Sequence, residues 1–134
     1  MMKQDSGLNR EKLLYIFKLY PQVKLVYFFG SRARGENAPI SDYDFAVYLS
    51  EKDKKKRFEL KLILMAKLSH FLKTDAVDVV ILNDAESPEL KFSIVKEGRL
   101  LYEQEPYKVL LEPRILNEYF DFIYGLRQYG LTKT

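Results

Sequence analysis

Two aspartates, Asp42 and Asp44, stand at the start of an otherwise apolar run and are the first residues that could do chemistry. Residues two apart on a strand point to the same face, so the two carboxylates would lie about 7 Å apart. Like charges this close raise each other's pKa unless a cation lies between them. Mg2+ or Mn2+, bound through oxygen ligands, would relieve the repulsion. The alternative is that Ser41 and Asp42 are solvated turn residues, and this pair alone favours neither interpretation.

A third carboxylate, Asp78, is the only charged residue in the apolar run over 76–81. If this run forms a strand beside 43–49, Asp78 can reach the same cation. The alternative is that Asp78 marks a solvated strand start. Asp75 is a competing third acid, but Thr74 and Asp75 are typical of the turn that follows a helix.

A short segment after the first apolar strand could bind phosphate. Gly30 would let the backbone approach a ligand closely. Ser31, at the start of a possible helical turn, would offer a hydroxyl and nearby N–H groups to phosphate oxygens. Arg32 and Arg34 add positive charge beside them. The sequence therefore predicts a phosphate-binding turn that accompanies the carboxylates.

Hydrophobic periodicity predicts the elements that must position these groups. Strands are expected over 23–29, 43–49, 77–82 and 99–102, and helices over 9–20, 54–73, 88–97 and 107–126. Asn9 and Ser87 are expected helix caps, and Pro88 and Gly98 suit the two ends of the third helix. The order α-β-β-α-β-α-β-α indicates an α/β or α+β fold over a single domain spanning residues 1–134.

Two helices carry conspicuous apolar side chains. In the helix over 54–73 the residues at helical spacing, expected to form its apolar face, are Phe58, Leu62, Met65, Leu68 and Leu72. Pro113 is expected to interrupt or restart the last helix. That helix has two stripes, one of Ile115, Tyr119, Phe122 and Leu126, the other of Leu116, Phe120 and Ile123. Either part of this surface docks a partner, or both stripes pack on the domain's own core.

Composition narrows the possible functions of the 134 residues. The chain has no Cys and one His, which excludes disulfides, a zinc-thiolate site, a Cys nucleophile and a His cluster. A net charge of +3 is too mild to indicate nucleic-acid binding, and none is expected. No membrane span or signal peptide is visible, so a cytoplasmic protein is expected. The basic run over 52–57 is interpreted as a solvated helix start, and His70 as a structural or solvated residue.

The motifs together resemble a known family. Gly30-Ser31-Arg32-Ala33-Arg34-Gly35-Glu36, followed by Ser41-Asp42-Tyr43-Asp44, resembles the G-S-x(10)-D-x-D signature of the DNA polymerase β-type nucleotidyltransferases. More narrowly, the chain is similar to the minimal nucleotidyltransferases, the MNT antitoxin halves of HEPN/MNT toxin–antitoxin pairs. That similarity extends through Val77-Asp78-Val79-Val80, Ser87-Pro88, Glu97-Gly98-Arg99-Leu100-Leu101-Tyr102 and Tyr119-Phe120-Asp121.

The resemblance implies a nucleotidyltransferase fold, with a small mixed sheet flanked by helices, and transfer of AMP from ATP to a hydroxyl. By position, Asp42 and Asp44 would bind two Mg2+ ions, and Asp78 would bind one of them and assist deprotonation of the acceptor. Ser31 would hold the β- and γ-phosphates, with Gly30 permitting their approach. Ile81 stands where many relatives carry another acid, and no catalytic loss is expected from that departure.

The resemblance also implies a partner, an all-helical HEPN RNase toxin that is silenced when one of its tyrosines receives AMP. Two alternatives stay open at this point. The chain could be an antitoxin that only binds, with an idle nucleotide site, or a nucleotidyltransferase for a small-molecule or RNA acceptor.

Overall fold

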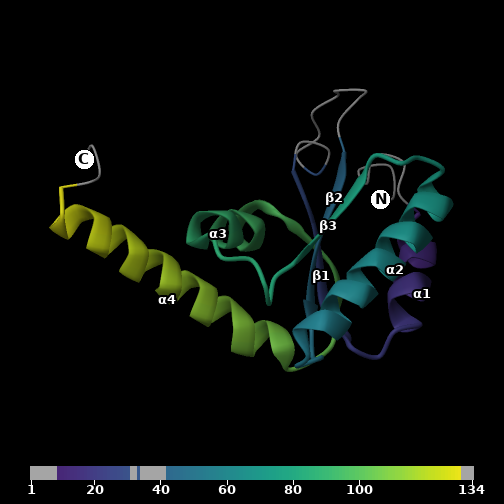
Figure 1. Ribbon diagram of the computed structural model, residues 1–134, viewed down its shortest axis with the longest axis horizontal. Coiled ribbons are helices and arrows are strands. Elements are labelled where there is room, and N and C mark those ends of the chain that lie inside the picture. The colour runs from purple at the N-terminus through teal and green to yellow at the C-terminus, as the bar shows by residue number, and fades with distance from the viewer. Residues whose placement is uncertain (1–8, 31–32, 34–41, 131–134) are drawn as a thin grey trace.

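The computed structural model describes residues 9–30, 33 and 42–130, and within them the chain forms four helices and four strands (Figure 1). In chain order these are α1 (Arg10–Lys18), β1 (Val23–Phe29), β2 (Tyr43–Leu49), α2 (Lys54–Leu72), β3 (Val77–Ile81), α3 (Pro88–Glu97), β4 (Arg99–Glu103) and α4 (Tyr107–Gln128). The predicted order of elements is confirmed. The predicted helical turn after Gly30 lies outside the described residues.

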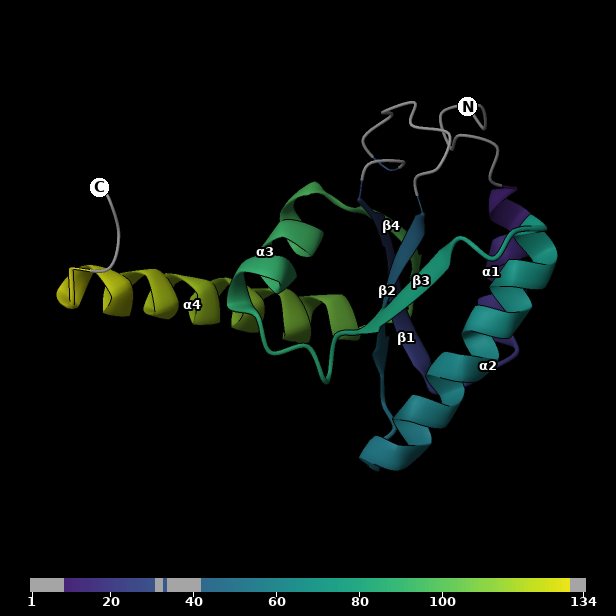
Figure 2. The same ribbon diagram turned by 45° about the horizontal axis from the view of Figure 1, so that its top comes forward.

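The strands form one mixed sheet in the order β3-β2-β1-β4. β1 is antiparallel to β2 and β4, whereas β2 and β3 run parallel. The helices cover both faces (Figure 2). Helices α1 and α2 pack on one face around Phe17, Phe28 and Phe45, and α3 and α4 pack on the other around Tyr27 and Ile94. The mixed sheet flanked by helices is therefore confirmed.

Helix ends follow the local signals in the sequence. The side chain of Asn9 accepts a hydrogen bond from the backbone N–H of Lys12 (3.2 Å), which caps α1. Ser87 caps α3 in the same way by accepting from the N–H of Leu90 (3.1 Å), and Pro88 occupies the first turn. These bonds satisfy backbone donors that have no partner inside a helix.

The predicted apolar face of α2 is wrong in part. The residues of α2 that are buried against the sheet are three leucines one turn apart: Leu60, Leu64 and Leu68. Phe58 and Leu62 are instead 55% and 50% exposed. Because α2 carries apolar residues on more than one side, spacing alone did not determine its rotation. The side of α2 that begins at Arg57, which forms an ion pair with Asp84, faces the sheet.

Pro113 does not interrupt the last helix, contrary to the prediction. Helix α4 runs for 22 residues with Pro113 inside it. Proline has no N–H, so the carbonyl of Val109 loses its usual partner four residues later. Val109 is 74% exposed, and water can therefore satisfy that carbonyl.

In the described part of the chain, no helix combines the length and apolar character needed to cross a membrane.

Candidate active site

The predicted carboxylates meet at one end of the sheet. Asp44 lies directly opposite Phe29 of β1 and directly opposite Asp78 of β3. Side chains of directly opposed residues project from the same face, so Asp44 and Asp78 point the same way. Ala46, two residues after Asp44, packs in the cluster beneath α3 and α4. The two carboxylates therefore face the side of the sheet that α3 and α4 cover.

Gly30 brings the end of β1 against one of these carboxylates. Its φ of +86° lies in the left-handed region that favours glycine. A Cβ atom built on Gly30 would lie 2.2 Å from Oδ2 of Asp44, far inside van der Waals contact. Glycine is thus required twice, by the backbone conformation and by the approach of the Asp44 carboxylate. The sequence assigned Gly30 to ligand approach and gave no sign of its contact with Asp44.

Negatively charged side chains gather at this end of the sheet. Asp44 is partly buried, and this burial, together with the charges of Asp78 and Asp42, raises its pKa to about 6. Asp42 lies just before β2 and is exposed, as is Asp78. Burial and two neighbouring like charges all disfavour the ionised form of Asp44. A cation bound here would relieve that cost, and the oxygen donors suit Mg2+.

A complete metal cage is not built into the described residues. Across residues 9–30, 33 and 42–130, no group of three or more His, Cys, Asp or Glu side chains is arranged to hold a metal ion. Mg2+ is usually bound through one or two carboxylates together with substrate phosphates and water. Asp44 with Asp42 or Asp78 fits that mode. The predicted binding of metal by all three acids stays a prediction.

The other half of the predicted site is not described. Ser31, Arg32 and Arg34 lie outside the described residues, so the phosphate-binding turn stays a prediction. Ala33, the described residue between them, packs against the cluster beneath α1 and α2.

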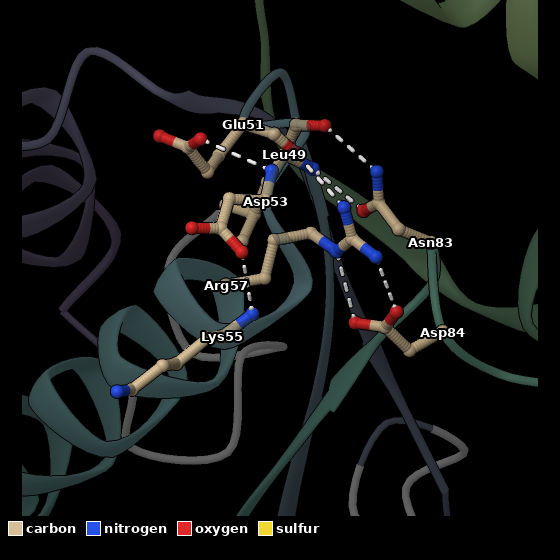
Figure 3. A network of polar contacts seen from close by, with 7 residues as sticks. All are labelled: Leu49, Glu51, Asp53, Lys55, Arg57, Asn83 and Asp84. Atoms are coloured by element: carbon tan, nitrogen blue, oxygen red, sulfur yellow. Dashed lines mark hydrogen bonds and ion pairs between the residues drawn. The ribbon is translucent and has the colours of Figure 1, made fainter.

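The opposite ends of β2 and β3 carry a different polar arrangement (Figure 3). The guanidinium of Arg57 donates two hydrogen bonds to the Asp84 carboxylate, at 3.0 and 2.6 Å, and a third to the backbone oxygen of Glu51. The amide of Asn83 accepts from the N–H of Leu49 and donates to its carbonyl. These bonds tie the segments that follow β2 and β3, which helps to keep Asp44 opposite Asp78.

This network was not predicted. From the sequence, Arg57 is expected to be one member of a solvated basic run, and neither Asn83 nor Asp84 stands out. Their position directly after an apolar strand was the available signal. The hydrogen bonds from Arg57 keep the pKa of Asp84 below its usual value, whereas the pKa of Asp44 is raised.

A cavity of about 250 Å³ lies away from the carboxylates, between α2 and the outer edge of β3. Its lining is mainly apolar: Phe58, Val80, Ile81 and Ala85, with Lys54, Lys61 and Asp84 at its margin. The ion pair of Asp84 with Arg57 leaves this cavity without an obvious reactive group. The carboxylate end of the sheet is therefore the better candidate for chemistry.

A comparison with known protein families matches most of the chain. Residues 11–107 match the family model described as polymerase beta, nucleotidyltransferase. That range contains Gly30 and all three carboxylates. Comparison with curated protein sequences gives no match.

Several solved structures resemble the chain along most of its length. A toxin–antitoxin structure with AMP-PNP is 28% identical, covers 91% of this chain and 95% of its own, and has a TM-score of 0.73. A mutant of the MntA–HpeT toxin–antitoxin is 27% identical with the same coverage and TM-score. A third structure, of tri-AMPylated Shewanella oneidensis HEPN toxin in complex with MNT antitoxin, is 26% identical, covers 90% and 92%, and has a TM-score of 0.66.

Proposed function

Because this chain belongs to the polymerase beta nucleotidyltransferase family, we propose that it transfers AMP from ATP to a tyrosine of a HEPN toxin and thereby acts as an antitoxin. The observation that carries the proposal is the opposition of Asp44 and Asp78 at the strand ends, beside Gly30. The similar structures support the nucleotide and the partner, since one is described with AMP-PNP and another with an AMPylated HEPN toxin. One domain over residues 1–134 would carry the whole site.

The predicted site residues would have separate roles in binding metal and in orienting the nucleotide. Asp42 and Asp44 would hold two Mg2+ ions, with Asp78 contributing to one of them. Bound there, Mg2+ supplies positive charge that offsets the charge of the triphosphate. Ser31 and Gly30, with Arg32 and Arg34 nearby, would orient the triphosphate.

The transfer itself is an in-line displacement. The tyrosine oxygen forms a bond to the α-phosphorus of ATP, the bond from that phosphorus to the bridging oxygen breaks, and pyrophosphate leaves. The phenolic proton passes to the Asp78 carboxylate, which is exposed and so accessible to an acceptor. Positioning and charge account for most of the catalysis, as in other phosphoryl transfers.

A second candidate function is binding without transfer. In that case the toxin would be neutralised by occlusion, and the carboxylates would be irrelevant to neutralisation.

The test is to incubate the protein with ATP, Mg2+ and the HEPN protein encoded by the adjacent gene, and to measure the intact mass of the latter. We expect a gain of one or more AMP units, and no gain with the double variant Asp42→Asn plus Asp44→Asn. The matched control is Asp75→Asn, the same chemical change at an exposed aspartate that the proposal leaves without a role. AMP transfer that survives the double variant would refute the assignment, and neutralisation without transfer would favour binding alone.

A further inference from the structure

The second half of α4 extends beyond the rest of the molecule. The contacts of α3 with this half are an ion pair from Lys91 to Glu118 (2.9 Å) and the ring of Phe92, which stacks on Tyr119 (3.9 Å between centroids) and meets Phe120 edge-on. Figures 1 and 2 show the last turns of α4 continuing past α3 and away from the sheet. We call residues 119–129 the α4 arm.

The α4 arm is apolar on more than one side. Phe120, Tyr124 and Tyr129 are 58%, 65% and 80% exposed, and three further apolar residues of the arm are partly exposed: Phe122, Ile123 and Leu126. A helix with apolar side chains on more than one side needs to be covered on more than one side. Aromatic side chains are also the type enriched at the centres of protein interfaces. The α4 arm therefore suits insertion into a groove better than contact with a flat surface.

A second copy of this chain is a poor occupant by area. The exposed parts of Phe120, Tyr124 and Tyr129 amount to roughly 400 Å², at about 200 Å² for each whole side chain. Two arms packed on each other would hide about 800 Å² in total, which is the size of a crystal contact and half that of a standard interface, about 1,600 Å². The arm thus needs a partner that also contacts another part of this molecule.

The location of the α4 arm indicates where that second contact lies. Asp44 and Asp78 face the same side of the sheet that α3 and α4 cover. A protein seated on the arm therefore lies on the side from which an acceptor must approach the carboxylates. Contacts at the arm and at the carboxylates together would give one continuous interface of adequate size.

We propose that the α4 arm is the docking element for the protein acceptor, and that it inserts into an apolar groove between helices of that protein. This inference rests on the proposed function, since it needs a protein as the acceptor. It adds the surface that holds the acceptor while its tyrosine reaches the site.

The test compares Phe120→Ser plus Tyr124→Ser with Tyr15→Ser, using the adjacent-gene HEPN protein as probe. Tyr15 is the matched control, because it is 67% exposed but lies on α1, on the other face of the sheet. Calorimetry should show binding at least about 30-fold weaker for the double variant and unchanged for the control. An unchanged thermal midpoint and unchanged ATP binding would show that the double variant is folded.

The possible failures are distinguishable. Wild-type affinity in the double variant, with AMP transfer intact in the wild type, overturns the docking proposal alone. A wild type that dimerises by itself, and becomes monomeric in the double variant, makes a second copy the occupant and also overturns it. Binding through the α4 arm without any AMP transfer overturns the proposed function and the role of the arm in holding an acceptor, and leaves the arm as a surface that only binds the HEPN protein.

Discussion

The two ends of strands β2 and β3 place the same side chain in opposite electrostatic states. At one end Asp44 lies opposite Asp78, and its pKa is raised to about 6 by burial and by its acidic neighbours. At the other end, hydrogen bonds from Arg57 lower the pKa of Asp84. The Asp84 carboxylate has its counter-charge in Arg57, whereas the charges of Asp78 and Asp42 disfavour the ionised form of Asp44. Unbalanced charge of this kind is typical of functional sites.

The two ends of β2 and β3 are therefore expected to affect different properties, stability at one end and chemistry at the other. The end that contains Arg57 and Asp84 should matter to stability and little to chemistry per folded molecule. The end that contains Asp44 and Asp78 should matter to chemistry and contribute little to stability, or oppose it.

After the complete loss of transfer expected for Asp44→Asn, the largest effect is expected at Asp78. Asp78→Asn removes the proposed proton acceptor, so the rate of AMP transfer should fall by roughly 10²–10⁴-fold. Asp75→Asn, three residues earlier, should leave the rate within about twofold. Single-turnover kinetics with the HEPN acceptor measure both variants, and equal rates for the two would remove Asp78 from the mechanism.

Gly30→Ala should have the next largest effect. The new methyl group would meet Oδ2 of Asp44 and would impose an unfavourable φ, so we expect a loss of about 2–3 kcal/mol in stability together with slower transfer. Gly130→Ala is the matched control, because φ there is also positive (+67°) but nothing lies within 4 Å. Urea unfolding compares them. A Gly30 variant no less stable than the control would show that the close approach to Asp44 is not a constraint.

At the opposite end, Arg57→Ala should lower the free energy of unfolding by about 1–2 kcal/mol. The side chain is 13% exposed, so the change leaves Asp84 without its partner in a partly desolvated place. Transfer per folded molecule should change little. A large loss of transfer at full stability would mean that this end also takes part in chemistry.

The smallest effect is a pH dependence of opposite sign at the two carboxylates. The pKa of Asp44 is higher in the folded state, so its contribution lowers metal-free stability as pH rises from about 4 to 6. Asp84 has a lowered pKa, so its contribution is present at neutral pH and is lost as pH falls below about 4. For Asp44 the change should be on the order of 1 kcal/mol, because solvent screens a partly exposed group.

The measurement is the free energy of unfolding against pH in EDTA, with each Asp→Asn variant subtracted from the wild type. The Asp44 difference should shrink when Mg2+ is added at neutral pH. If the free-energy differences of both variants changed with pH in the same direction, Asp44 and Asp84 would not be in opposite electrostatic states.

Strand bounds and helix caps could largely be predicted from the sequence. Val23–Phe29 and Tyr43–Leu49 have the predicted bounds, because an apolar β-branched run with a polar or glycine boundary has few alternatives. The caps at Asn9 and Ser87 could be predicted because each depends on one hydrogen bond, from the backbone N–H three residues later. Such features depend on neighbours in the chain.

Features that depend on contacts between residues far apart in the sequence could not be predicted from it. Arg57, on the side of α2 that faces the sheet, pairs with Asp84, 27 residues away. The meeting of Asp44 with Asp78 depends on β3 pairing beside β2, which the sequence could state only as a condition. The continuity of α4 through Pro113 depends on the exposure of Val109.

The most direct test of the central claim is the amount of AMP transferred to the HEPN protein per folded molecule by Asp44→Asn and by Asp84→Asn. Both variants remove one negative charge from the same pair of strands, at opposite ends. We expect no detectable AMP on the acceptor with Asp44→Asn. With Asp84→Asn we expect a wild-type amount, at a temperature where both variants are folded. Wild-type transfer by Asp44→Asn would contradict it.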